Sequence, residues 1–143
     1  MAEIPLQISS NKKELQTEVI YNFLHNHAAW AKGISRELVQ RAIDGSLCFG
    51  AYLENKQVGF ARLVTDMATF GYLCDVFILP EFRSKGYAST LMNHIFNLDV
   101  IKGMRRIVLV TSDAHHIYRP VGFENLSYPD KYMELHRPNI FKK

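Results

Sequence analysis

The chain has 143 residues and a formal charge of +3 at pH 7, with 48% hydrophobic and 22% charged residues. This length predicts a single domain over residues 1–143, and this composition is typical of a globular protein with an apolar core. The mild, dispersed basic charge favours a phosphate-bearing small ligand over a nucleic acid.

The N-terminal residues Met1–Pro5 lack a basic region followed by an apolar stretch, and no window is apolar enough to span a membrane. Cys48 and Cys74 lie in apolar, strand-like runs, which is typical of reduced, buried thiols. These features predict a cytoplasmic protein without membrane association and favour free cysteines over a disulfide.

The first third of the chain predicts one strand and two helices. Apolar residues alternate with polar ones over Ile4–Ile8, and they recur at three- and four-residue intervals from Lys12 to about His25. The segment Trp30–Ile34 interrupts this pattern. Ser35 is then a suitable N-cap for a second helix that Gly45 ends.

The middle of the chain predicts an antiparallel meander. The strands Leu47–Leu53 and Gln57–Val64 flank a tight turn, and Phe70–Leu79 forms the third strand. The part from Tyr72 onward is apolar on both faces except at Asp75, as expected of a central strand that is covered on both sides.

The last third predicts a helix over Gly86–Leu98, a strand over Arg106–Thr111, a short helix over His115–Tyr118 and a final strand over Met133–His136. A strand, a helix and a second strand in this order form a crossover. The expected fold class is therefore α+β (α/β).

The turn Pro80–Ala88 joins the buried strand to a helix N-terminus. Unpaired backbone N–H groups and the helix dipole favour an anion there, and Gly86 and Ala88 leave room for a phosphate close to the main chain. The same turn also suits a plain strand-to-helix loop, so its context decides between the two interpretations.

That context is a hydrophobic strand before the turn, a crossover after it, and a Tyr-x-x-x-Gly-Phe sequence further on. In this arrangement the chain resembles the GNAT superfamily of acetyl-CoA N-acyltransferases, whose first motif is Gln/Arg-x-x-Gly-x-Gly/Ala. The matching residues are Arg83, Gly86 and Ala88 in the first motif, and Tyr118, Gly122 and Phe123 in the second.

The resemblance implies the GNAT fold, a central twisted mixed β-sheet flanked by about four helices. The sheet would splay between the strand at Tyr72–Leu79 and the strand at Arg106–Thr111, and acetyl-CoA would bind there with its pantetheine arm added like a strand. The pyrophosphate would lie on the turn. The implied coenzyme-binding residues are Val76, Phe77, Ile78, Arg83, Ser84, Lys85, Gly86, Tyr87, Ala88 and Ser89.

The resemblance also implies a catalytic role for Tyr118, which would protonate the departing thiolate; packing beneath the coenzyme is the alternative. Asp75 is the candidate base because a carboxylate in an apolar setting has a raised pKa. It would alternatively pair with a buried cation such as Arg62. Strand parity places Tyr72 and Cys74 on the face opposite Asp75.

Where family members carry a basic side chain on this strand, the chain has Tyr72, which leaves a water relay open as the base. Tyr72 and Trp30 are candidate substrate-binding residues, although Trp30 would equally anchor the two helices. Ser112 or Asp113 is the expected cap of the helix at His115, and we predict no metal.

Together these features predict transfer of an acetyl group from acetyl-CoA to a primary amine of a small molecule or peptide, by direct attack. A non-catalytic acyl-CoA sensor and a nucleotide- or RNA-binding domain are the alternatives, and the latter lacks a Gly-rich loop that ends in Lys-Ser/Thr. The expected partners are coenzyme A and the amine, without nucleic acid. Family members often dimerise, so a homodimer is a further expectation.

Overall fold

A computed structural model describes residues 4–142 and contains one mixed sheet with the strand order β1-β2-β3-β4-β5. Neighbouring strands are antiparallel from β1 to β4, whereas β4 and β5 are parallel. The strands are β1 (Gln7–Ser9), β2 (Leu47–Leu53), β3 (Lys56–Thr65), β4 (Phe70–Ile78) and β5 (Arg106–Leu109).

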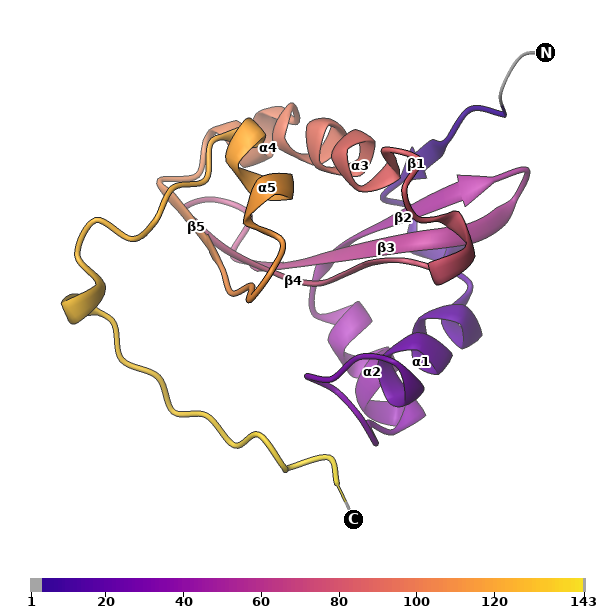
Figure 1. Cartoon of the computed structure of the whole chain (residues 1–143), viewed down its shortest axis with the longest axis horizontal. Coiled ribbons are helices and arrows are strands. Elements are labelled where there is room, and N and C mark those ends of the chain that lie inside the picture. The colour runs from indigo at the N-terminus through magenta and orange to yellow at the C-terminus, as the bar shows by residue number, and fades with distance from the viewer. Residues whose placement is uncertain (1–3, 143) are drawn as a thin grey trace.

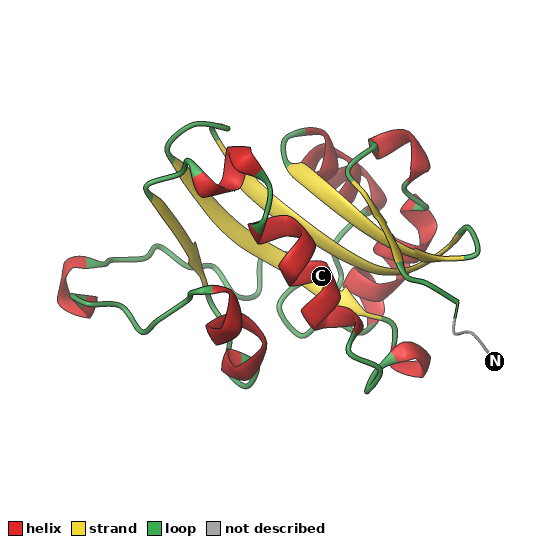
Figure 2. Cartoon of the chain, turned by 90° about the horizontal axis from the view of Figure 1, so that it is seen from above, coloured by secondary structure: helices red, strands yellow, loops and turns green. Residues whose placement is uncertain are grey.

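Helices cover both faces of the sheet (Figures 1 and 2). The helices α1 (Thr17–Asn26) and α2 (Arg36–Asp44) cover one face, which we call the α1–α2 face. The opposite face, the α3 face, carries α3 (Tyr87–Phe96), α4 (Asp99–Lys102) and α5 (His115–Tyr118). Short 3-10 turns lie at Lys12–Glu14, Pro80–Phe82, Arg119–Val121 and Pro129–Lys131.

Each face of the sheet has its own apolar core. On the α1–α2 face, the ring of Phe23 from α1 stacks on Phe77 from β4 with 4.1 Å between centroids. On the α3 face, Leu91 and Met92 pack against Leu73 of β4. Because β4 contributes buried residues to both cores, the prediction of a doubly covered strand is confirmed.

Local signals placed several elements correctly. The Ser35 hydroxyl accepts a hydrogen bond from the Leu38 amide and begins α2, and Gly45 ends it. Glu54 and Asn55 both have positive φ, 47° and 70°, as the two-residue type I′ turn of a hairpin requires. Both cysteines are free, as predicted.

The first helix is shorter than predicted. The Asn11 side chain accepts a hydrogen bond from the Lys13 amide and begins a separate 3-10 turn at Lys12, after which Leu15 is extended. Apolar residues recur at helical spacing through this break because the spacing reflects which side chains face the core. It does not show that the backbone is continuously helical. The α-helix itself begins at Thr17.

The predicted cap of α5 was wrong. The N-cap is Ala114, and neither Ser112 nor Asp113 caps the helix with its side chain. The hydroxyl of Thr111 accepts the hydrogen bond from the Ala114 amide instead, at 3.1 Å. The hydroxyl that binds the N-cap amide therefore lies four residues before the first helical residue, just beyond the end of β5 at Leu109.

The predicted final strand at Met133–His136 was also wrong. These residues are exposed and unpaired, and they belong to a segment, residues 124–142, that we call the tail. The tail leaves the body beyond β5 and returns to the α1–α2 face, where Phe141 packs on the core (Figure 1). Alternating hydrophobicity records a local preference for strand, whereas a strand also needs a partner edge.

Among residues 4–142, no helix is both long and apolar enough to cross a membrane.

Candidate functional site

The strands β4 and β5 pair over four positions and then separate. Their parallel register begins at Phe70 opposite Arg106 and ends at Leu73 opposite Leu109, although β4 continues to Ile78. The amide of Leu79 donates to Val58 of β3 at 2.8 Å, so the main-chain groups of the preceding residue point to the side that β5 has vacated. This separation leaves the edge of β4 beyond Leu73 without a strand partner, and at Ile78 the carbonyl on this edge accepts a hydrogen bond from Arg83.

A β-bulge accompanies the separation. The pairing of β3 with β4 shifts by one residue between Phe60 and Arg62, and Asp75 has a φ of 53° in the left-handed region. Two residues of β4, Asp75 and Val76, therefore lie opposite Ala61 alone. Bulges bend a strand and increase its twist, which turns β4 away from β5.

The bulge overturns the predicted parity of β4. Asp75 lies on the same face as Cys74, because its carboxylate contacts Arg62, which lies directly opposite Cys74 in the register. Strict alternation would have placed Asp75 on the α3 face. A residue with left-handed backbone breaks the alternation of side chains between the two faces of the strand. No residue type in this stretch of the sequence indicates that the bulge is there.

The carboxylate of Asp75 has two partners. Arg62 donates from Nε to Oδ2 at 2.9 Å, and the exposed indole of Trp30 donates from Nε1 to Oδ1 at 2.8 Å. Arg62 also donates from Nη1 to the Ser46 hydroxyl at 2.9 Å. The structural alternative for Asp75, pairing with Arg62, is thus present, and Trp30 both anchors to the sheet and presents 55% of its surface to solvent.

The face around Asp75 contains a partly buried thiol, that of Cys74, and a partly exposed phenol, that of Tyr72. Burial raises the pKa of Cys74 to about 12, so this thiol is protonated at neutral pH and is unsuited to act as a nucleophile. Tyr72 is 36% exposed, and burial raises the pKa of its phenol as well. Neither side chain is a base at neutral pH.

The turn after β4 presents backbone amides to solvent. Ser84 and Gly86 have positive φ, 63° and 79°, and the first hydrogen bond of α3 runs from Thr90 to the Gly86 carbonyl at 3.1 Å. The amides of residues 87–89 therefore precede the hydrogen-bonded ladder, and the first turn contains no acidic residue. A Cβ placed on Gly86 would meet nothing within 4 Å. These features fit a bound anion.

Arg83 connects the turn to the open edge of β4. Its Nε donates to the carbonyl of Ile78 at 2.9 Å, which leaves the terminal guanidinium nitrogens for other acceptors. Lys85 and Ser84 are exposed on the turn. The sequence predicted the charge of Arg83 at this site but not the bond that orients it.

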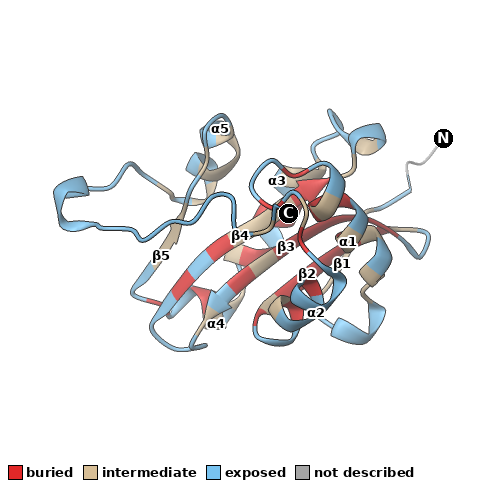
Figure 3. Ribbon diagram, turned by 90° about the horizontal axis from the view of Figure 1, so that it is seen from below, coloured by how far each residue is buried: buried red, intermediate tan, exposed pale blue. Residues whose placement is uncertain are grey.

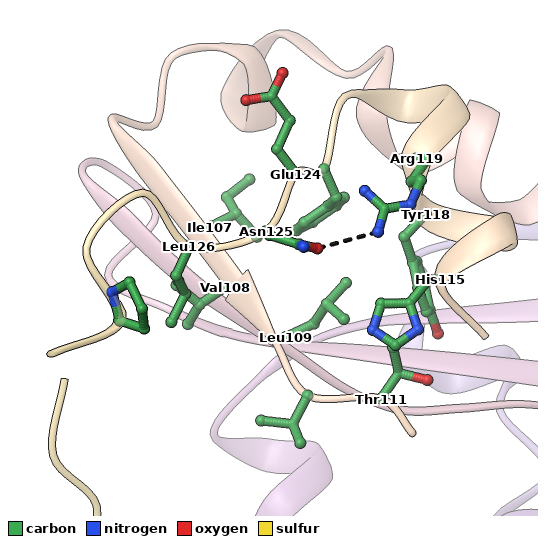
Figure 4. A pocket seen from close by; sticks show the side chains of 13 residues that line it. Ile107, Val108, Leu109, Thr111, His115, Tyr118, Arg119, Glu124, Asn125 and Leu126 are labelled. Atoms are coloured by element: carbon green, nitrogen blue, oxygen red, sulfur yellow. Dashed lines mark hydrogen bonds between the residues drawn. The ribbon is translucent and has the colours of Figure 1, made fainter. Parts of the chain in front are cut away.

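Tyr118 lies on the α3 face, in a groove of about 530 Å³ between β5 and the chain that follows α5. Figure 4 shows Tyr118 and His115 on one side of this groove and the β5 side chains at its floor. The Tyr118 ring meets Phe123 edge to face at 6.0 Å, and burial raises the pKa of its phenol. The hydroxyl is therefore protonated at neutral pH and able to donate a proton.

The structure separates the predicted residues into two groups. Val76 and Tyr118 pack on the α3 core, whereas Asp75, Tyr72 and Trp30 lie on the α1–α2 face. The opening between β4 and β5 lies between these groups. Within residues 4–142, no cluster of His, Cys, Asp and Glu has the geometry to hold a metal ion.

The chain matches the family model of the acetyltransferase (GNAT) family over residues 20–123. A crystal structure from Xanthomonas campestris pv. campestris, described as a candidate GNAT acetyltransferase, is 42% identical with a TM-score of 0.94; the match covers 99% of this chain and 100% of that one. The chain belongs to the GNAT acetyltransferase family, and its sheet and helices form the GNAT fold.

Two further relatives extend the comparison. FG08082 of Gibberella zeae, described as a candidate acetyltransferase, is 30% identical over 133 residues. The match covers 78% of this chain and 74% of that protein. A Clostridium acetobutylicum crystal structure described as a predicted acetyltransferase with acetyl-CoA shares the fold at 17% identity and a TM-score of 0.67. The match covers 92% of this chain and 95% of that chain.

Proposed function

We propose that this protein transfers an acetyl group from acetyl-CoA to a primary amine of a small molecule or peptide. The observation that carries this proposal is the end of the β4–β5 pairing at Leu73, followed along β4 by an open edge and then by the amides of α3. A long ligand with an amide-rich arm and a pyrophosphate matches these two features in that order. The related Clostridium structure, which contains acetyl-CoA, has the same fold.

In this proposal the pantetheine arm lies along Val76–Ile78, and the pyrophosphate lies over the amides of Ser84–Ser89. Arg83 and Lys85 add positive charge, and Arg83 is already oriented by its bond to the Ile78 carbonyl. Gly86 keeps the approach to the main chain open.

The reaction forms one C–N bond and breaks one C–S bond. The neutral amine nitrogen attacks the thioester carbonyl, the sulfur leaves with the electron pair of the C–S bond, and the nitrogen loses a proton. We assign Tyr118 as the acid that protonates the leaving sulfur, because its burial keeps the phenol protonated. Cys74 takes no part as a nucleophile, since its thiol holds its proton.

The amine enters from the α1–α2 face in this proposal, past Trp30 and Tyr72. Asp75 has both oxygens engaged by Trp30 and Arg62, which supports a positioning role. The proton of the amine then leaves through water, because Tyr72 is not a base.

An acceptor screen with acetyl-CoA that detects free thiol release tests the transfer. It is run with wild-type protein and with Gly86→Glu, whose carboxylate would lie where the pyrophosphate is expected. Acetyl-CoA binding by wild-type protein, lost in Gly86→Glu, supports the assigned turn. Intact binding in that variant would refute it, and binding without transfer to any amine would favour a sensor.

A further inference from the structure

Part of the α1–α2 face is apolar and lies outside the cover of its two helices. Figure 3 views this face and shows α1 and α2 over one part of the sheet, with the β4–β5 part extending beyond them. Val64 lies opposite Tyr72 in the β3–β4 register, and paired positions share a face of the sheet. Phe70, two residues before Tyr72 on β4, lies on that face as well. We call Val64, Phe70 and Tyr72 the apolar patch.

The apolar patch is exposed to solvent. Val64 is 41% exposed and Phe70 is 43% exposed, and the ring of Tyr72 between them is partly exposed. Neither apolar core of the described chain includes any of the three residues. An exposed apolar surface of several neighbouring side chains marks a place where a ligand or a partner binds.

The apolar patch adjoins the place where the acetyl group is proposed to arrive. The pairing of β4 with β5 ends at Leu73, one residue after Tyr72. Two residues of a strand span about 7 Å, so a molecule whose nitrogen lies at the gap has its body over the patch. The exposed indole of Trp30, which donates to Asp75 at 2.8 Å, lies on the same face. This continuity assigns the patch to the amine that receives the acetyl group.

The tail passes the apolar patch and contributes a negative charge to it. Arg106 lies beside Phe70 in the β4–β5 register, and its guanidinium lies 6.0 Å from the ring centroid of Tyr132. Glu134 follows two residues later and is exposed. Burial and the charge of Glu134 both raise the pKa of Tyr72. The Glu134 carboxylate is thus close enough to act on an ammonium group that is bound beside Tyr72.

Other carboxylates near the apolar patch are engaged. Both oxygens of Asp75 accept hydrogen bonds, as described above, and Asp66 in the β3–β4 turn accepts four hydrogen bonds from residues 68–70. Glu134 therefore offers one negative charge, which suits one ammonium group. A polyamine would place further ammonium groups against apolar surface, and this costs free energy.

We propose that the acceptor is a monoamine with an aliphatic or aromatic body, which lies on the apolar patch while its nitrogen reaches the gap beyond Leu73. This inference rests on the proposed function, because it specifies the amine that the same site accepts. Contact with Val64, Phe70 and Tyr72 removes the body of the amine from water. Each methylene group that is fully buried in this way strengthens binding about fourfold.

The fluorescence of Trp30 tests the inference without any chemical step, because Trp30 is the single tryptophan of the chain. The protein is saturated with coenzyme A, which carries no acetyl group, and is titrated with butylamine, hexylamine and spermidine. We expect hexylamine to bind at least about fourfold more tightly than butylamine, and spermidine to bind less tightly than hexylamine. A smaller ratio, tighter binding of spermidine, or no binding of any amine would overturn the inference.

Two variants of the apolar patch locate the effect. Val64→Thr and Phe70→Thr remove apolar surface at exposed positions and should reduce the ratio of the butylamine Kd to the hexylamine Kd. Ile4→Thr is the matched control, since Ile4 is 49% exposed and precedes β1 at the opposite edge of the sheet. Far-UV circular dichroism identifies the variants that fold. A folded patch variant with an unchanged ratio would overturn the inference.

Thiol release from acetyl-CoA with the same amines, and with a short peptide, separates this inference from the proposed function. Binding that depends on chain length, without thiol release, would overturn the transfer and support the patch as an amine-binding surface. Thiol release that is fastest with spermidine or with the peptide would support the transfer and overturn the monoamine.

Discussion

Arg62 of β3 and Asp75 of β4 form an ion pair with 2.9 Å between Nε and Oδ2, across the bulge at which β4 bends. The two side chains are mostly buried, with 17% and 10% of their surface exposed. Asp75 thus neutralises the Arg62 guanidinium, which has little access to water. The backbone of Asp75 is itself in the left-handed region.

Replacing Asp75 with Asn should lower the free energy of unfolding by about 3 kcal/mol, because the buried Arg62 loses its counter-charge. Urea denaturation measures this change. Ser46→Ala, which removes a neutral acceptor from the same guanidinium, is the control and should cost about 1 kcal/mol. Equal losses in the two variants would show that the charge of Asp75 is unimportant.

Trp30→Phe should raise the KM for the amine more than it lowers kcat. The substitution removes the N–H donor to Asp75 and part of an exposed aromatic surface, and it leaves the turn at residues 83–89, the proposed coenzyme site, intact. Steady-state kinetics with a substrate from the acceptor screen measure both constants. A selective effect on the KM for acetyl-CoA would place Trp30 outside the amine site.

Tyr118→Phe should lower kcat by about 10²- to 10⁴-fold, the usual contribution of a general acid. The ring and its contact with Phe123 remain, so the thermal transition and acetyl-CoA binding should change little. Thiol-release kinetics and calorimetric titration measure the two quantities. Unchanged turnover would reduce Tyr118 to a packing residue.

Gly86→Ala should weaken acetyl-CoA binding, whereas Gly122→Ala should not. Both glycines have positive φ, and a Cβ at either position meets nothing within 4 Å, so the backbone strain of about 1 kcal/mol is shared. Only Gly86 lies at the start of α3. Titration with acetyl-CoA measures the difference, and equal affinities would argue against the pyrophosphate at this turn.

The free energy of unfolding should fall as the pH rises above about 9. Burial raises the pKa of Cys48 from 9.0 to about 11 and that of Cys74 to about 12, so the folded protein retains protons that the unfolded chain releases. The stabilisation is complete below the unfolded pKa and declines by about 1.4 kcal/mol per pH unit for each thiol.

Urea denaturation at pH 8, 9 and 10 measures this decline. The double variant Cys48→Ala/Cys74→Ala is the control. The cavities left by the two substitutions should lower the free energy of unfolding equally at each pH, so the stability of this variant should depend less on pH over this range. An identical pH dependence in both proteins would assign the decline to other groups, such as Tyr52, whose pKa burial raises to about 12.

Local chemistry made much of this fold predictable. The caps at Ser35 and Gly45 set the ends of α2, and the two polar residues at Glu54 and Asn55 set the β2–β3 hairpin. The helix at His115–Tyr118 was predicted with its observed bounds. Each of these signals acts between residues that are close together in the chain, so it can be recognised from the sequence alone.

Relationships between distant segments were not predictable from the same signals. The face of Asp75 depends on a bulge that only the pairing of β3 with β4 defines. The segment Met133–His136 has the composition of a strand, but no strand edge among residues 4–142 pairs with it. The turn at residues 83–89 was predicted as the coenzyme site from its motif and remains a prediction, whereas the orientation of Arg83 depends on where the Ile78 carbonyl points.

At the bulge, β4 contains one residue more than β3, and this difference determines what a one-residue deletion would do to the sheet. Deleting one residue from Asp75–Val76 would leave the pairs on both sides, Arg62 with Cys74 and Phe60 with Phe77, in register. The shortened strand would lose its bend and run on beside β5. A single-codon deletion would therefore preserve the hydrophobic pattern of the chain while removing the gap between β4 and β5 in which we propose that acetyl-CoA binds.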